Sequence, residues 1–201
     1  PTQADAGRIF IFTRSQSNWT QQAILTSDII ADSGKFGEVV DISGDGNRII
    51  TSTVNSNSIY IFSKSGTVWS LEQKITPPVG VTFSQLQNAG TKYFSINTAG
   101  DRFILGFGFS AGVAYVYSRT GTVWTQEAQL IASDVQSADG FGWSVSISGD
   151  CSVVVIGSYE NDPAGVNNAG SVYTFTRIGT TWTQRTKLLA SNKAASDFLG
   201  I

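Results

Sequence analysis

Residues 170–191 read GSVYTFTRIGTTWTQRTKLLAS, which is two short apolar stretches separated by a Gly-Thr turn. The first stretch, 171–177, is rich in β-branched and aromatic residues, and the second, 182–188, begins at Trp182. Residues of these kinds favour a pleated strand, and small turn residues between two strands favour a hairpin. The stretch therefore predicts a β-hairpin.

The hairpin phrase occurs four times in the chain, each time with one Trp. The other copies are GRIFIFTRSQSNWTQQAILTS, NSIYIFSKSGTVWSLEQKITP and GVAYVYSRTGTVWTQEAQLIAS, and the four markers are Trp19, Trp69, Trp124 and Trp182. Between the copies lies a second phrase: FGEVVDISGDGNRIITS (36–52), YFSINTAGDRFILGF (93–107) and FGWSVSISGDCSVVVIGS (141–158). Each full period thus holds four short apolar runs separated by turn residues. This pattern predicts an all-β array of four-stranded antiparallel sheets, as in the blades of a β-propeller.

The first strand of each hairpin is apolar on both faces. In the second copy, Tyr60 and Phe62 share one face, while Ile59 and Ile61 share the other. A strand of this kind must be covered on both faces. We therefore expect the sheets to stack face to face.

The second strand of each hairpin alternates between apolar and polar residues. Simple alternation places Trp182, Gln184, Thr186 and Leu188 on one face of the strand 182–188. This predicts a half-exposed outer strand on which the Trp packs beside the Leu.

Composition excludes several classes of site. The 201 residues include no His and a single Cys, Cys151, and the formal net charge is −2. Without His there is no Ser–His or Cys–His nucleophile and no His-ligated zinc, and one Cys cannot form an internal disulfide. Scattered Lys and Arg residues predict no nucleic-acid partner, and the absence of a long apolar run predicts no membrane insertion.

The phrases FGWSVSISGD and GSVYTFTR together resemble the FG-GAP repeat of integrin-α-like β-propellers, in particular that of bacterial and viral surface or virion proteins. The FG pair is present at Phe36–Gly37 and Phe141–Gly142. In the copy between these two, the alignment places Gly90–Thr91 at the position of the FG pair, and the final copy breaks off at DFLGI. The resemblance implies one partial propeller domain, residues 1–201, of about three and a half blades. The predicted blades are approximately 7–30 (half), 36–76, 90–132, 141–190 and 197–201, the start of the next.

Propellers of this family usually have about seven blades, so three and a half blades do not close a ring. Three arrangements are consistent with this expectation. The chain is a piece of a longer polypeptide, or two copies complete one ring, or the sheets form an open stack. The expected partners are therefore other protein subunits or the remaining blades of a longer chain, with surface glycans as a second class.

The resemblance also raises the question of calcium, because integrin-type blades often carry a D-x-D-x-D-G loop. The corresponding turns here, SGDGNR, NTAGDR and SGDCSV, have one Asp each. A single Asp beside Gly, Asn or Ser is typical of a β-turn. We therefore expect no metal and no other cofactor.

Three residues are candidates for binding: Trp143, which follows an FG pair in one copy only, and Asp162 and Asn167 in SYENDPAGVNNAG (158–170). Packing is the alternative interpretation for Trp143, and a solvated loop is the alternative for the other two. Four carboxylates lie in the polar segments between repeats, at Asp28, Asp32, Asp134 and Asp139. A glycosidase would need two such groups in one pocket, and the sequence does not bring them together.

These observations predict a protein that is not an enzyme. The resemblance implies a structural or adhesion module in a virion appendage, such as a tail fibre, or in a secreted surface protein. The expected location is extracellular or on the virion surface. A carbohydrate-binding lectin is the main alternative, and a hydrolase that uses only Asp and Glu is a further one.

Overall fold

The computed structural model describes residues 7–28, 35–53, 57–78, 81 and 93–201. Apart from a single 3-10 turn, Pro163–Gly165, the regular structure of these residues is entirely β. The strands are β1 (Ile9–Ser15), β2 (Asn18–Leu25), β3 (Val40–Ile42), β4 (Arg48–Thr53), β5 (Ser58–Ser65), β6 (Val68–Ile75), β7 (Phe94–Ile96), β8 (Arg102–Phe107), β9 (Val113–Thr120), β10 (Val123–Leu130), β11 (Phe141–Ile147), β12 (Val153–Ser158), β13 (Ser171–Ile178) and β14 (Thr181–Leu188). No helix in this part of the chain is long and apolar enough to cross a membrane.

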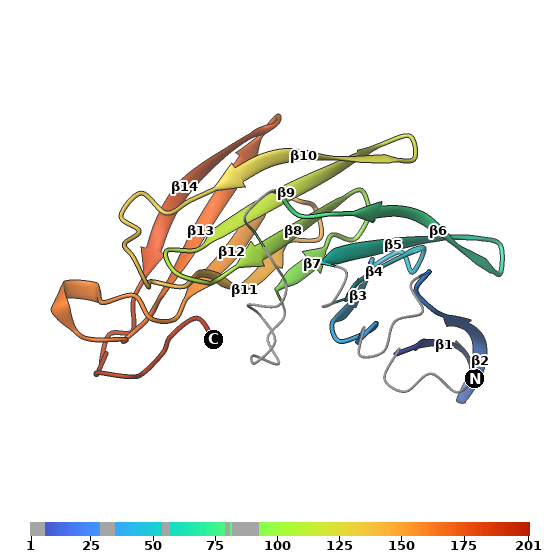
Figure 1. Ribbon diagram of the computed structural model, residues 1–201, viewed down its shortest axis with the longest axis horizontal. Coiled ribbons are helices and arrows are strands. Elements are labelled where there is room, and N and C mark those ends of the chain that lie inside the picture. Colours follow the sequence, from blue (N-terminus) through green and yellow to red (C-terminus); the bar gives the residue numbers. More distant parts are fainter. Residues whose placement is uncertain (1–6, 29–34, 54–56, 79–80, 82–92) are drawn as a thin grey trace. The chain divides into compact units, whose positions relative to one another are not determined.

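The strands form four antiparallel sheets in which sequence neighbours pair (Figure 1). We call β1–β2 the first sheet, β3–β6 the second, β7–β10 the third and β11–β14 the fourth. The predicted all-β fold with four-stranded antiparallel sheets is confirmed. The blade boundaries and the blade count remain predictions.

Each sheet from the first to the fourth ends in a hairpin with the same irregularity. In β13–β14, Thr174 pairs with Thr186 and Phe175 pairs with Gln184, so Arg185 has no residue opposite it. This is a β-bulge, in which two residues on one strand oppose one on the other. The predicted alternation along 182–188 is therefore wrong, because the extra residue reverses the faces. Trp182 lies on the face of the β13 aromatic residues, and Leu188 pairs with Val172 and lies on the opposite face.

The two faces of a sheet can be named from the strand β13 and its equivalents. The aromatic face carries Phe10 and Phe12, Tyr60 and Phe62, Tyr115 and Tyr117, or Tyr173 and Phe175. The aliphatic face carries Ile9 and Ile11, Ile59 and Ile61, Ala114 and Val116, or Val172 and Thr174. As predicted, both faces of β5 and of the middle of β9 are buried. In β1 only the aliphatic face is buried.

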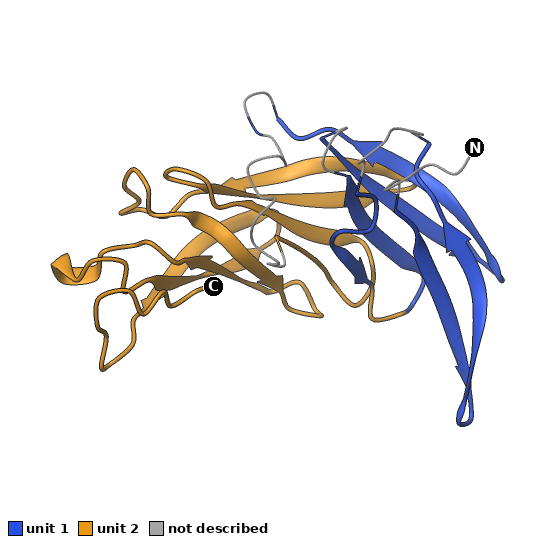
Figure 2. Ribbon diagram, turned by 60° about the horizontal axis from the view of Figure 1, so that its bottom comes forward, with its two compact units in different colours: residues 1–42, 46–87 blue, residues 43–45, 88–201 orange. Residues whose placement is uncertain are grey.

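The chain divides into two compact units, residues 1–42 with 46–87, and residues 43–45 with 88–201 (Figure 2). Each unit contains one complete interface between consecutive sheets. In the first unit, the aliphatic face of the first sheet packs on the aromatic face of the second, through Ile9, Ile11 and Leu25 against Phe36, Ile49, Tyr60 and Phe62. In the second unit, the third sheet packs in the same way on the fourth. Burial of this apolar surface is the main source of stability in such a stack.

The FG pair also links consecutive sheets. Phe141 forms a parallel bridge with Gly112, and its N–H donates to the carbonyl of Ala111 at 3.2 Å. Gly112 has a φ of +83°, and a Cβ there would overlap the carbonyl oxygen of Phe141. Glycine is therefore required at this position. The equivalent bridge at the end of the chain joins Gly170 to Leu199, so Leu199–Gly200 takes the place of the FG pair in the sequence DFLGI.

Candidate functional site

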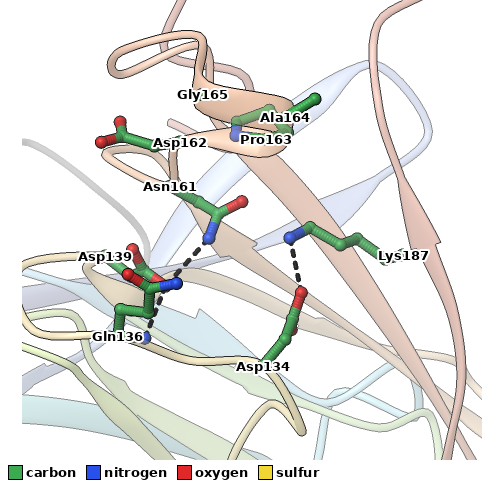
Figure 3. A pocket seen from close by; sticks show the side chains of 9 residues that line it. All are labelled: Asp134, Gln136, Asp139, Asn161, Asp162, Pro163, Ala164, Gly165 and Lys187. Atoms are coloured by element: carbon green, nitrogen blue, oxygen red, sulfur yellow. Dashed lines mark hydrogen bonds and ion pairs between the residues drawn. The ribbon is translucent and has the colours of Figure 1, made fainter.

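A polar hollow of about 400 Å³ lies in the second unit. Its walls come from the segment between β10 and β11, the loop between β12 and β13, and the end of β14 (Figure 3). The lining residues are Asp134, Gln136, Asp139, Asn161, Asp162, Pro163, Ala164, Gly165 and Lys187. All three carboxylates in this set stand next to amide, ammonium or backbone donors.

Asp139 forms the buried floor of the hollow. Its Oδ2 accepts hydrogen bonds from the N–H of Gln136 at 2.8 Å and from Nδ2 of Asn161 at 2.9 Å. Asn161 is also buried, and its Oδ1 accepts a hydrogen bond from Ser171 Oγ at 2.7 Å. Because buried polar groups are costly unless they are paired, this network fixes the two loops against each other.

Asp134 forms one side of the hollow together with Lys187. Its carboxylate accepts hydrogen bonds from Lys187 Nζ at 2.7 Å and from the Tyr173 hydroxyl at 2.9 Å. Burial acts to raise the pKa of Asp134, but the hydrogen bonds from Lys187 and Tyr173 outweigh it, and the pKa lies below its ordinary value. Asp134 is therefore ionised at neutral pH.

The same arrangement occurs in the first unit. Tyr60 donates a hydrogen bond to Asp28 at 2.5 Å, and Lys74 Nζ lies 3.5 Å from the same carboxylate oxygen. Lys74 pairs with Tyr60 across β5–β6, as Lys187 pairs with Tyr173 across β13–β14. Asp28 and Asp134 are thus equivalent residues that hold consecutive sheets together. Asp32, the remaining predicted carboxylate, lies outside the described residues.

The loop between β12 and β13 carries two of the candidate binding residues. Asp162 is exposed and lines the hollow, and its Oδ1 accepts a hydrogen bond from the N–H of Asn168 at 2.6 Å. Asn167 is also exposed but is not among the lining residues, and its carbonyl accepts a hydrogen bond from the N–H of Ser196 at 3.0 Å. The structure therefore places Asp162, but not Asn167, at the hollow.

Trp143 lies in β11 and is not among the residues that line the hollow. Its ring packs against Tyr159 with centroids 4.3 Å apart, and Tyr159 in turn lies 6.0 Å from Phe198. The indole N–H of Trp143 is buried, and no hydrogen-bond acceptor among the described residues faces it. Burial raises the pKa of Tyr159 to about 12, so its hydroxyl stays protonated at neutral pH.

In the three turns that correspond to the calcium loop of integrin-type blades, the single Asp accepts a hydrogen bond from a residue of its own turn. Asp101 accepts a hydrogen bond from Asn97 Nδ2 at 2.7 Å, and Asp150 accepts one from Ser148 Oγ at 2.6 Å. Within the described part of the chain, no group of three or more Cys, Asp or Glu residues could hold a metal ion. The expectation that the protein binds no cofactor remains a prediction.

Sequence reasoning missed the hollow because its carboxylates are far apart in the chain. Asp134, Asp139 and Asp162 all line it. A signal was present, since Asp28 and Asp134 both follow the last strand of a sheet and precede a sheet with a Tyr–Lys pair. This repeated pattern indicates that the Asp after one sheet contacts the Tyr–Lys pair of the next sheet, which is how Asp134 and Lys187 come together at the hollow.

Residues 124–175 match the sequence model of the FG-GAP repeat. The chain contains an FG-GAP repeat. The matched segment runs from Trp124 in β10 to Phe175 in β13, and so includes Phe141–Gly142 and the interface between the third and fourth sheets. The resemblance to this family is confirmed, while a particular affinity with bacterial or viral members remains a prediction.

Solved structures share the fold of this chain. A protein assigned as a 6-phosphogluconolactonase from Bacteroides uniformis is 10% identical, with a TM-score of 0.60 over 94% of this chain and 51% of its own. A second, from Bacteroides fragilis, is 14% identical, with a TM-score of 0.56 over 91% and 52%. TolB from Acinetobacter baumannii is 11% identical, with a TM-score of 0.51 over 98% and 42%.

The chain spans about half the length of the first two of these structures. At such low identity the similarity shows the fold alone, which is that of a β-propeller. No curated protein sequence matches the chain significantly.

Proposed function

We propose that this protein, which contains an FG-GAP repeat, is a non-catalytic structural and adhesion module, located outside the cell or on a virion surface. In this proposal it belongs to a virion appendage of the tail-fibre kind or to a secreted surface protein. Its partners are other protein subunits or further blades, and it contacts its target through the loops around the hollow. The observation that supports a non-catalytic role is that side chains of the hollow are held by one another: Asn161 donates a hydrogen bond to Asp139, and Lys187 donates one to Asp134.

The chemistry of the hollow favours binding over hydrolysis. A glycosidase that works with two carboxyl groups needs one of them protonated near neutral pH, which requires a raised pKa. Asp134 has a lowered pKa because of Lys187 and Tyr173. Asp139 accepts two hydrogen bonds from Gln136 and Asn161 and forms part of the loop structure.

Carbohydrate binding is the second candidate function, and the composition of the hollow favours it. A sugar hydroxyl both donates and accepts hydrogen bonds, and the lining offers carboxylate acceptors together with the ammonium of Lys187 and the exposed side-chain amide of Gln136. Asp162 is exposed, so a ligand can reach its free lone pairs. Glycans are therefore the small ligands to test first.

The test is binding of the labelled chain to an array of neutral, sialylated and sulfated glycans. We expect binding by the wild type, and about tenfold weaker binding by Asp162→Asn, a change equivalent to about 1.4 kcal/mol. Asp150→Asn is the matched control, because Asp150 is an exposed Asp at the other end of β12. This control should bind as the wild type does.

Other results would redirect the proposal. Loss of binding in Trp143→Ala, with Asp162→Asn unchanged, would move the ligand to the aromatic group beside β11. A blank array would contradict the carbohydrate function. Turnover of a chromogenic glycoside or a lactone that Asp134→Asn abolishes would contradict the non-catalytic role itself.

A further inference from the structure

The β-bulge stands at the same place in all four hairpins, three residues after the Trp. The bulged residues are Gln22, Glu72, Glu127 and Arg185. A bulge redirects the side chain of its extra residue. The position of the bulge therefore decides which side chain each sheet presents to its neighbour.

At both interfaces described above, the bulged residue of one sheet binds the Trp of the next. Gln22 Oε1 accepts a hydrogen bond from Trp69 Nε1 at 3.1 Å, and Glu127 Oε1 accepts one from Trp182 Nε1 at 3.0 Å. The second interface adds an ion pair, with Arg177 Nε 3.3 Å from Glu127 Oε1. An acceptor at the bulge is thus part of how these sheets recognise one another.

The aromatic face of the first sheet has the same kinds of donor and apolar group, but none of the described sheets packs against it. Phe10 is 52% exposed, Phe12 is 50% exposed and Trp19 is 65% exposed. Their equivalents in the fourth sheet, Tyr173 and Phe175, are buried by the third sheet. Arg14 pairs with Trp19 across β1–β2, as Arg177 pairs with Trp182 across β13–β14. Neither Arg14 nor Trp19 has a polar partner among the residues that the structure describes.

We propose that this face of β1–β2 is a docking surface for the aliphatic face of another four-stranded sheet, one that carries Glu or Gln at its bulge. That acceptor would receive the indole N–H of Trp19 and pair with Arg14. The rest of the contact would be aliphatic side chains against Phe10 and Phe12. The assignment rests on the two interfaces inside this chain and is independent of any ligand in the hollow.

The fourth sheet of a second copy does not fit this surface. Its bulged residue is Arg185, which would face Arg14 with the same charge. Its Nε donates to Thr176 Oγ1 at 2.6 Å, so the guanidinium already lies beside the aliphatic face. Thr174 and Thr186 on that face replace Val116 and Ala128 of the third sheet, and both substitutions make the face more polar. The occupant is therefore a sheet of different sequence, and head-to-tail pairing of identical copies is disfavoured.

The experiment grafts the third-sheet residues onto the fourth sheet and measures self-association by sedimentation equilibrium. The grafted chain carries Thr174→Val, Arg185→Glu and Thr186→Ala, and its matched control carries only the two Thr substitutions. We expect the grafted chain to associate head to tail with a dissociation constant at least about tenfold lower than that of the control, and less strongly at high salt. The wild type should remain monomeric.

A second substitution identifies the surface that is used. Arg14→Glu should weaken association of the grafted chain, because two negative charges would then face each other at positions 14 and 185. The same substitution should strengthen association of the control, because its Arg185 would then face a negative charge. Phe12→Ser should abolish association of the grafted chain. Lys193→Glu, introduced into the control, makes the same charge change elsewhere and should have no effect. Circular dichroism confirms folding of each variant.

Three outcomes would overturn the proposal. One is a folded grafted chain that stays monomeric. Another is association that Arg14→Glu and Phe12→Ser leave unchanged. The third is a wild-type chain that associates as strongly as the grafted one, since Arg185 would then be no obstacle.

Discussion

Asp150 organises its turn by accepting hydrogen bonds from residues of the same turn. It lies between β11 and β12 and accepts hydrogen bonds from Ser148 Oγ at 2.6 Å, from the N–H of Ser152 at 3.0 Å and from Ser152 Oγ at 2.8 Å. A calcium loop would need several carboxylates pointing at one ion. Here one carboxylate is present, and the hydroxyl groups of Ser148 and Ser152 and the N–H of Ser152 donate hydrogen bonds to it within its own turn.

This geometry predicts an unusually acidic side chain. The hydrogen bonds from Ser148 and Ser152 lower the pKa of Asp150 from 3.8 to about 2. A depressed pKa stabilises the folded state above the unfolded value, so the contribution of Asp150 should be present above pH 3.8 and be lost as the pH falls toward 2. Carboxyl chemical shifts in an NMR titration measure this pKa directly. Ser152→Ala should move it upward, and a wild-type value near 3.8 would contradict the turn geometry.

The hairpin is the element that the sequence predicts best, but the sequence does not indicate the β-bulge within it. Runs such as 171–177 indicate a strand because their residues suit a pleated sheet, and the turn follows from Gly and Thr. Strict alternation then assigns a face to every later residue, and one extra residue inverts that assignment. Nothing in WTQRTKL marks Arg185 as the extra residue. Only the pairing with β13 shows it.

Glu127 should be a sensitive bulged residue, because its side chain is 5% exposed and lies between two arginines. Arg102 Nε is 3.1 Å from Glu127 Oε2, and Arg177 Nε is 3.3 Å from Glu127 Oε1. Glu127→Leu would leave both guanidinium groups without this carboxylate and should cost about 3–5 kcal/mol of unfolding free energy. Glu127→Gln keeps an acceptor for Trp182 and should cost about 1.5–3 kcal/mol.

Urea unfolding measures both losses, and the other interface supplies the control. Gln22 binds Trp69 without a charge, so Gln22→Leu should cost only about 1 kcal/mol. Equal losses at Gln22 and Glu127 would mean that the ion pairs contribute nothing to the interface.

For the molecule as a whole, the sequence predicts repetition but not the surfaces that repetition creates. The period of four apolar runs predicts stacked antiparallel sheets, because no single sheet can cover both of its apolar faces. The hollow is different, since its walls combine Asp134, Asp162 and Lys187 from three separate segments. Their approach depends on how the fourth sheet packs on the third, and residue patterns along one strand carry no information about that packing.

Loss of stability should be local, because a sheet in a repeat array interacts chiefly with the sheet packed against it in the same unit. Gly112→Ala tests this, since its Cβ would overlap the carbonyl oxygen of Phe141 at a φ of +83°. We expect a loss of about 3 kcal/mol or more. Gly121→Ala is the matched control: φ is +63°, but nothing lies within 4 Å of its Cβ, and the loss should be about 1 kcal/mol. Hydrogen exchange should show faster exchange of β7–β14 amides in Gly112→Ala, with β1–β6 unchanged. Uniform acceleration over all strands would mean instead that the chain unfolds as one cooperative unit, and that the link at Gly112 stabilises every sheet rather than the two that it joins.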